Sequence, residues 1–150
     1  MSRTESVRLG ILGTRRGLAY AEAAEQLPDV EVAAFCGQSP ERLEIIGQLC
    51  PDARLFTSYD EMLADPSINA VVVANYADQH VAPACQALRA GKHVLSDVPA
   101  FATIAEGVEL ARTVEAGDRV YMFGENMCYL AFVQEMRRLY RTGEIGEVTY

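Results

Sequence analysis

The stretch VRLGILGTRRGLAYAEAAEQL, residues 7–27, decides the fold. It runs from a short apolar strand through Gly13 and Gly17 into an alanine-rich amphipathic helix, which is the outline of a dinucleotide-binding turn. When the fingerprint GxGxxG is counted from Gly13, Arg15 takes the second place, Leu18 takes the third, and Gly17 comes one position early. A strand, a glycine turn and a helix N-terminus remain, and the free N–H groups of a helix N-terminus favour an anion.

The residues of the turn, Thr14, Arg15 and Arg16, lie where a pyrophosphate would be held. An arginine in place of the second glycine crowds a pyrophosphate, but its guanidinium can also turn outward and pair with a phosphate. Both outcomes stay open from the sequence. So does a third, in which the glycines only shape a βα turn that binds nothing.

Outward from this stretch, apolar β-branched runs alternate with helical periodicity, which is typical of βαβ units on a parallel sheet. We expect strands at 7–13, 30–37, 54–57, 68–75, 92–97 and 119–125. We expect helices at 17–27, 40–49, 59–65, 78–90, 103–117 and 130–141. This pattern predicts an α/β fold with a doubly wound parallel sheet, a Rossmann fold of strand order 3-2-1-4-5-6.

The end of the chain bears on domain organisation. Residues 1–142 are predicted to form one dinucleotide-binding domain. The final EVTY, residues 147–150, has the pattern of an opening strand with no later element to pair with. We therefore interpret residues 143–150 as the start of a C-terminal domain that these 150 residues do not include.

Composition narrows the classes of function. Half of the residues are hydrophobic and 23% are charged, as in an ordinary globular protein. A net charge of −8 without a cluster of Lys and Arg argues against nucleic-acid and membrane partners. No apolar run suits a signal peptide or a membrane span, so we expect a cytoplasmic protein. Reduced, mostly buried thiols are expected at Cys36, Cys50, Cys85 and Cys128, whose spacing suits no zinc site.

The stretch FCGQSPER after the second strand bears on the choice of cofactor. NAD-binding domains usually place an acidic residue here to accept hydrogen bonds from the adenosine ribose, but this chain has Gly37. Without a carboxylate, a 2′-phosphate is not repelled, and its candidate donors are Ser39, Arg42, Arg15 and Arg16. The sequence therefore predicts an NAD(P) site with a slight preference for NADP. Arg42 has an alternative role as a solvated helix residue paired with a neighbouring Glu.

From the fourth strand on, the chain resembles the N-terminal domain of the Gfo/Idh/MocA family, the relatives of glucose–fructose oxidoreductase and inositol dehydrogenase. The stretches that carry the resemblance are DEMLADPSINAVVVANYADQHVAPACQALRAGKHVLSDVPA, GENMCYL and GEIGEVTY. The resemblance implies a Rossmann-type domain that binds a nicotinamide dinucleotide. It also implies a following α/β domain that carries much of the substrate site and the oligomer interface. The small-molecule substrate would then bind only with that domain present, and the protein would form a homo-oligomer.

Two departures from the family pattern concern its chemistry. The family's Glu-Lys-Pro motif places the acid and the lysine beside the nicotinamide, with the lysine tied to substrate binding and proton transfer, but this chain reads Asp97-Val98-Pro99. Valine has no donor and no titratable proton. The family's Thr-Pro is replaced by Asn75-Tyr76, whereas the His at position 80 is kept. The peptide before the proline is often cis in the family, and the sequence leaves this open.

The candidate site follows from the rule that ligands of open α/β sheets lie outside the carboxyl ends of the strands. Together with the resemblance, this rule gives a set of cofactor-binding candidates with no catalytic residue and no metal ligand: Gly13, Thr14, Arg15, Arg16, Gly17, Gln38, Ser39, Arg42, Asn75, Tyr76, His80, Asp97, Val98, Pro99, Glu125 and Asn126. Four residues also have a purely structural alternative: His80 would cap a helix, Glu125 and Asn126 would shape a turn, and His93 would pack at a strand end.

The leading hypothesis is the nucleotide-binding domain of an NAD(P)-dependent oxidoreductase for a sugar, polyol or related hydroxyl or carbonyl substrate, inactive by itself. The main alternative is a non-catalytic nucleotide-sensing or regulatory Rossmann domain, because Arg15, Gly37 and Val98 each replace a group that the chemistry normally uses. A third reading is a structural module with an occluded cleft.

Overall fold

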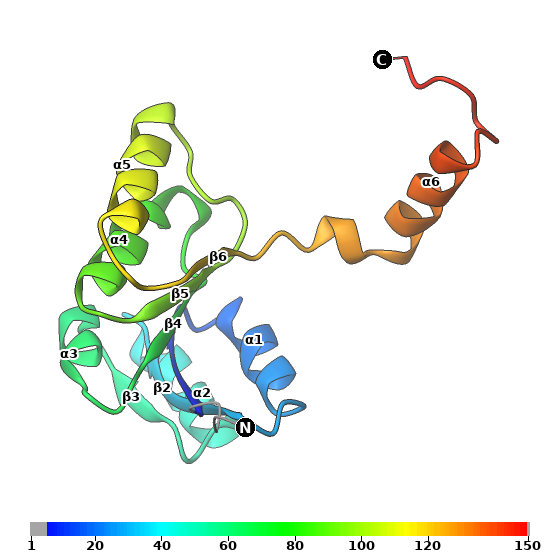
Figure 1. Cartoon of the computed structure of the whole chain (residues 1–150). Helices are drawn as coiled ribbons and strands as arrows, with labels where there is room; N and C mark the ends of the chain where they lie inside the picture. Colours follow the sequence, from blue (N-terminus) through cyan, green and yellow to red (C-terminus); the bar gives the residue numbers. More distant parts are fainter. Residues whose placement is uncertain (1–5, 150) are drawn as a thin grey trace, which may run out of the picture.

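The structure, a computed structural model, describes residues 6–149. Its six strands form one parallel sheet of order β3-β2-β1-β4-β5-β6 (Figure 1), which confirms the predicted fold and strand order. The strands are β1 (Val7–Leu12), β2 (Val30–Cys36), β3 (Arg54–Phe56), β4 (Ala70–Val73), β5 (His93–Ser96) and β6 (Tyr121–Phe123). The helices are α1 (Gly17–Ala24), α2 (Pro40–Leu49), α3 (Tyr59–Ala64), α4 (Val81–Arg89), α5 (Ile104–Glu115) and α6 (Ala131–Arg141), with 3-10 turns η1 (Ala77–Gln79) and η2 (Met127–Tyr129).

Two layers of helices cover the sheet. One core cluster joins α3, α4 and α5 to one face, and a second joins α1 and α2 to the other. Strand β4 is the centre of both, because Val71 and Val73 belong to the first cluster and Val72 to the second, and all three are fully buried. This explains why the strand reads as a continuous apolar run.

The helix expected over residues 78–90 is split in the structure, with η1 first and α4 starting at Val81. The reason is Pro83, which has no N–H to donate. A helix begun at 78 would lack a backbone hydrogen bond in its interior, whereas in α4 Pro83 falls in the first turn, where amides have no partner in the helix.

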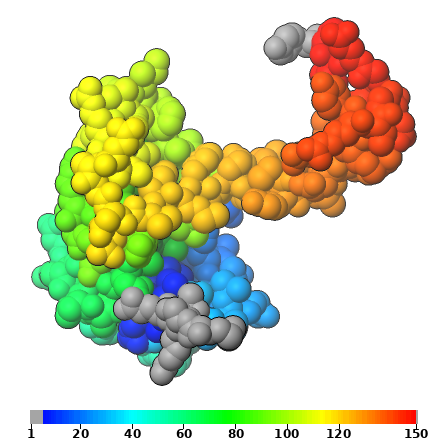
Figure 2. Space-filling view, in the orientation of Figure 1, coloured from blue at the N-terminus to red at the C-terminus, as the bar shows by residue number. Residues whose placement is uncertain are grey.

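After β6 the chain leaves the body of the domain, and α6 projects away from the sheet (Figures 1 and 2). No residue of α6 is buried, and Phe132, Met136 and Tyr140 are exposed. The strand expected from residue 147 is wrong for residues 147–149, which are irregular, because nothing lies beside them to pair with. Tyr150 lies outside the described residues.

Several bulk expectations are tested by residues 6–149. All four cysteines are free, with Cys36 and Cys85 buried, Cys50 partly buried and Cys128 exposed. Within this range, no helix combines the length and apolar character that crossing a bilayer requires. The same residues contain no group of three or more His, Cys, Asp or Glu side chains placed to hold a metal ion.

Candidate functional site

The loops that follow β1, β2, β4, β5 and β6 meet at one edge of the sheet, since all strands are parallel. Hydrogen bonds between neighbouring chain segments continue past the strand ends into these loops. Gly13 N–H donates to Cys36 O (3.0 Å), Asp97 N–H to Val73 O (2.9 Å) and Gly124 N–H to Ser96 O (2.8 Å). The candidate residues therefore do gather along the carboxyl edge, as the sequence predicts.

Gly13 is required at the first turn. Its φ is +112°, and a Cβ at this position would lie 2.2 Å from the carbonyl oxygen of Ala74. Only glycine fits, because both the backbone conformation and the space exclude a side chain. The turn after β1 is thus pressed against the end of β4.

Gly17 has the role that the fingerprint gives to its third glycine. It is the first residue of α1 and is buried, and a Cβ there would lie 2.5 Å from Cγ2 of Ile11. Because glycine has no Cβ, α1 can pack closely on β1. Counting the fingerprint from Gly13 predicts Leu18 for this role, but the turn is one residue shorter than in the fingerprint, so Gly17 takes it.

The turn presents several free donors. The backbone amides of residues 14–17 find no hydrogen-bond acceptor within residues 6–149, and Arg16, the N-cap residue, makes no side-chain cap. The side chain of Arg15 is exposed. Free amides at a helix N-terminus fit an anionic group such as a diphosphate.

After β2, the side chain of Thr14 occupies the space beside Gly37. A Cβ at Gly37 would lie 2.5 Å from Cγ2 of Thr14, so the missing acidic residue has a steric reason. Arg42 donates from Nη2 to Thr14 O (2.7 Å), and its Nε is buried without a partner. The alternative of a solvated Arg42 paired with Glu is therefore wrong. Ser39 Oγ accepts from Arg42 N–H (3.3 Å) as the cap of α2, and Gln38 is exposed.

Asp97, after β5, is held by α1. Its carboxylate accepts from Arg16 Nε (2.7 Å) and from the hydroxyl of Tyr20 (2.8 Å), a residue that the sequence analysis missed. The sequence feature that points to Tyr20 is its position one helical turn after Arg16, on the same side of the helix. Burial raises the pKa of Asp97, but hydrogen bonds from Arg16, Tyr20 and the backbone of Val98 outweigh it and hold the pKa below its usual value. Burial, with the bond to Asp97, raises the pKa of Tyr20 to about 12, so the phenol stays a donor.

His80 joins two of the loops. It is 2% exposed, with Nδ1 2.9 Å from Pro99 O and Nε2 3.4 Å from Asn75 O. It makes no side-chain cap, so the capping alternative is wrong. The Val98–Pro99 peptide is cis. His80 thus fastens the loop after β5 to the loop after β4.

The remaining candidates differ in exposure. Tyr76 is 77% exposed, and Asn75 Oδ1 is buried without a partner. Glu125 Oε1 accepts from Met127 N–H (2.7 Å), so its side chain stabilises the turn into η2, and Asn126 is exposed. The packing role predicted for His93 is confirmed, because its Nδ1 accepts from Val120 N–H (3.0 Å).

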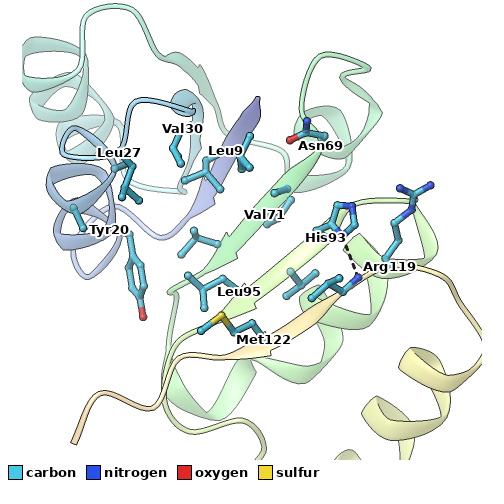
Figure 3. Close-up of a pocket in the computed structure, with 17 residues that line it drawn as sticks. Leu9, Tyr20, Leu27, Val30, Asn69, Val71, His93, Leu95, Arg119 and Met122 are labelled. Carbon is cyan, nitrogen blue, oxygen red and sulfur yellow. Dashed lines mark hydrogen bonds between the residues drawn. The ribbon is translucent and has the colours of Figure 1, made fainter. Parts of the chain in front are cut away.

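A separate groove of about 510 Å³ crosses the sheet face beside α1 (Figure 3). Its lining is mainly Val, Leu and Ala from β1, β4, β5, β6 and α1. Asn69, His93 and Arg119 lie toward one end and Tyr20 lies at the other. This groove is distinct from the candidate site, because the free amides and Asp97 lie beyond the strand ends, and Tyr20, which donates to Asp97, is the one residue of that network in the groove lining.

Comparison with known proteins agrees with this geometry. Residues 7–125 match a family model described as the Gfo/Idh/MocA oxidoreductase family, NAD-binding Rossmann fold. A glycosyl hydrolase family 109 protein from Solibacter usitatus is 30% identical over 97% of this chain, which spans 36% of that protein's length.

Two solved structures share the fold. Scyllo-inositol dehydrogenase from Lactobacillus casei, with bound NAD(H) and scyllo-inositol, has a TM-score of 0.84 at 22% identity, over 96% of this chain and 43% of its own. The WlbA dehydrogenase from Bordetella pertussis, in complex with NADH and UDP-GlcNAcA, has a TM-score of 0.84 at 24% identity, over 94% of this chain and 43% of its own.

Proposed function

Because the chain belongs to the Gfo/Idh/MocA oxidoreductase family and carries its NAD-binding Rossmann domain, we propose that it is the cofactor-binding part of a dehydrogenase that acts on a sugar, a polyol or a related small molecule. The observation that carries this proposal is the turn at residues 13–17, whose free amides stand where α1 begins. The related proteins named above concern inositol, a sugar nucleotide and glycosides, which supports this class of substrate.

The residues present fit a nicotinamide dinucleotide. The amides of residues 14–17 would hold its diphosphate, and the loops that begin near Asn75 and Asp97 would lie toward its nicotinamide end. When bound, the cofactor supplies the hydride donor or acceptor. The protein's own contribution is to bind and to orient.

For the adenosine end, we propose a preference for NADP over NAD. The residue directly after β2 is Gly37 and carries no carboxylate, since Thr14 occupies the space beside it. The exposed Gln38 and Ser39 precede the N-terminus of α2. A helix N-terminus favours an added phosphate. Arg42 contributes through its bond to Thr14 O rather than as a free cation.

The residues after β4 and β5 that stand in the family's catalytic positions are poorly suited to proton transfer. Val98 carries no proton to exchange, Asp97 is held ionised by its partners, and both ring nitrogens of His80 face backbone carbonyls. We propose that substrate binding and proton transfer need residues outside this chain and that this chain alone catalyses no turnover.

The test is calorimetric titration of the chain with NADPH, NADH and ADP, with adenosine as the ligand that lacks phosphate. Tighter binding of NADPH than of NADH, and no heat with adenosine, is the expected result. Binding of ADP without any gain from the nicotinamide half would instead support the second candidate, a nucleotide-sensing domain, which the loss of the motif's lysine at Val98 favours. Silence with all three phosphorylated ligands would refute both.

A further inference from the structure

Arg16 occupies an unusual place between two parts of the site. Its backbone amide is one of the free donors of the turn, while its guanidinium reaches across the edge of the sheet to Asp97 after β5. The ion pair joins a side chain that is 47% exposed to one that is 7% exposed. One residue therefore serves the diphosphate turn with its backbone and the far loop with its side chain.

The two residues of this ion pair differ in how many other hydrogen-bond partners they have. Asp97 keeps the Tyr20 hydroxyl and the backbone of Val98 as donors if Arg16 leaves, so its carboxylate is not left unpaired. Arg16 has Asp97 as its one hydrogen-bonding side chain within residues 6–149, apart from a stacking contact with Tyr20, whose ring centroid lies 5.8 Å from the guanidinium carbon. Because the guanidinium is partly exposed, water screens its side of the ion pair and competes for its N–H donors.

A diphosphate is the stronger competitor for this guanidinium. It carries more negative charge than a carboxylate and offers several oxygens for paired N–H donors. Because the anion would be held by the amides of residues 14–17, the Arg16 side chain starts from the very segment that binds it.

We propose that Arg16 is a partner-exchanging residue: a bound diphosphate takes its guanidinium from Asp97, so that cofactor binding frees one side of the Asp97 carboxylate. This inference rests on the proposed function. It makes Asp97 a competitor of the cofactor, and it couples the diphosphate turn to the loop that follows β5 through one side chain.

The test is a double-mutant cycle with ADP and inorganic pyrophosphate as probes, measured by calorimetry. Arg16→Gln should weaken ADP binding on the order of 10-fold, because one charge-assisted contact is lost. Asp97→Asn should tighten it by about 5-fold, because the competitor is gone. In the Arg16→Gln background, Asp97→Asn should change the affinity less than about 2-fold.

The matched control is Asp65→Asn. Asp65 is another buried carboxylate paired with an arginine, Arg54, but it precedes β4 and so lies at the opposite edge of the sheet. Its substitution should leave ADP affinity unchanged, whatever it does to stability. A change equal to that of Asp97→Asn would mean that net charge alone is responsible, and the exchange would be refuted.

Other outcomes are equally decisive. If Asp97→Asn tightens ADP binding just as much without Arg16, simple repulsion explains the effect and the exchange is wrong, although the cofactor site stands. If the wild-type chain binds no dinucleotide, the proposed function fails and the exchange fails with it. Should Asp97→Asn not fold, the wild-type Arg16 Hε resonance decides: it should shift with ADP and not with adenosine, and a static resonance overturns the proposal.

Discussion

The contact between Gly37 and Thr14 gives a sharp prediction about why this domain lacks an acidic residue after β2. A Cβ added at Gly37 would meet Cγ2 of Thr14 at 2.5 Å, whereas Oγ1 of the same residue would be at 3.5 Å. Carbon atoms in favourable contact lie about 3.5–4.0 Å apart. Overpacking of this kind costs about 1–3 kcal/mol, so Gly37→Ala should lower the free energy of unfolding by that amount.

Thr14→Ser removes the methyl group and keeps the hydroxyl, whose distance to the new Cβ is ordinary. In this background Gly37→Ala should cost close to nothing. The coupling energy between the two positions should thus be about 1–3 kcal/mol. Urea unfolding followed by far-UV circular dichroism measures it, since the chain contains no Trp. In thermal unfolding, each kcal/mol corresponds to about 2–4 °C for a domain of this size.

Gly117→Ala provides the control, because the nearest atom to its Cβ would be 3.7 Å away. It should have the same small effect in both backgrounds. An equal cost of Gly37→Ala with and without the Thr14 methyl would refute the steric argument. If the argument holds, Gly37→Asp combined with Thr14→Ser is the variant that should shift binding from NADPH toward NADH.

Three further predictions concern other groups. Gly13→Ala should destabilise the fold more than Gly91→Ala in urea unfolding; both positions have positive φ, at about 1–2 kcal/mol of strain, but only Gly13 also meets a backbone oxygen, and equal costs would contradict this. The folded-state pKa of Asp97 lies below its unfolded value of about 3.9, so its ionised carboxylate should stabilise the fold above that pH, and this stabilisation should be lost as the pH falls further. The difference in the free energy of unfolding between the wild type and Asp97→Asn, measured from pH 7 to pH 3, should therefore become smaller. A constant difference would exclude the linkage. Tyr20 should ionise only near pH 12, so the alkaline absorbance step lost in Tyr20→Phe should lie there and not near pH 10.

Much of the fold was predictable because its signals are local. The buried run of β4, the Ser39-Pro40 start of α2 and the alternation of strands and helices each follow from short-range patterns, and they determine the strand order through the rules for parallel sheets. Errors appeared where a tertiary partner decides the outcome. Residues 147–149 form no strand without a neighbour, and Pro83 delays the start of α4.

The site was predictable in its location and less so in its contacts. Strand ends could be read from the sequence, so the edge was known. Side-chain partners could not, because they join residues far apart in the chain: Arg16 with Asp97, and His80 with Pro99. For the same reason Tyr20 was missed, since only the fold shows that its hydroxyl reaches the loop after β5.

Two features of the loop after β5 are connected: Val98 replaces the motif's lysine, and Asp97 accepts hydrogen bonds from Arg16 and Tyr20. A buried carboxylate needs donors, and without a neighbouring cation in its own loop Asp97 takes them from Arg16 and Tyr20. These partners keep the carboxylate ionised and poorly basic, which suits anchoring and not proton transfer. Under the proposed function, the edge of the sheet would hold a dinucleotide through the amides of residues 14–17, while Val98 supplies no group in this loop that could move a proton.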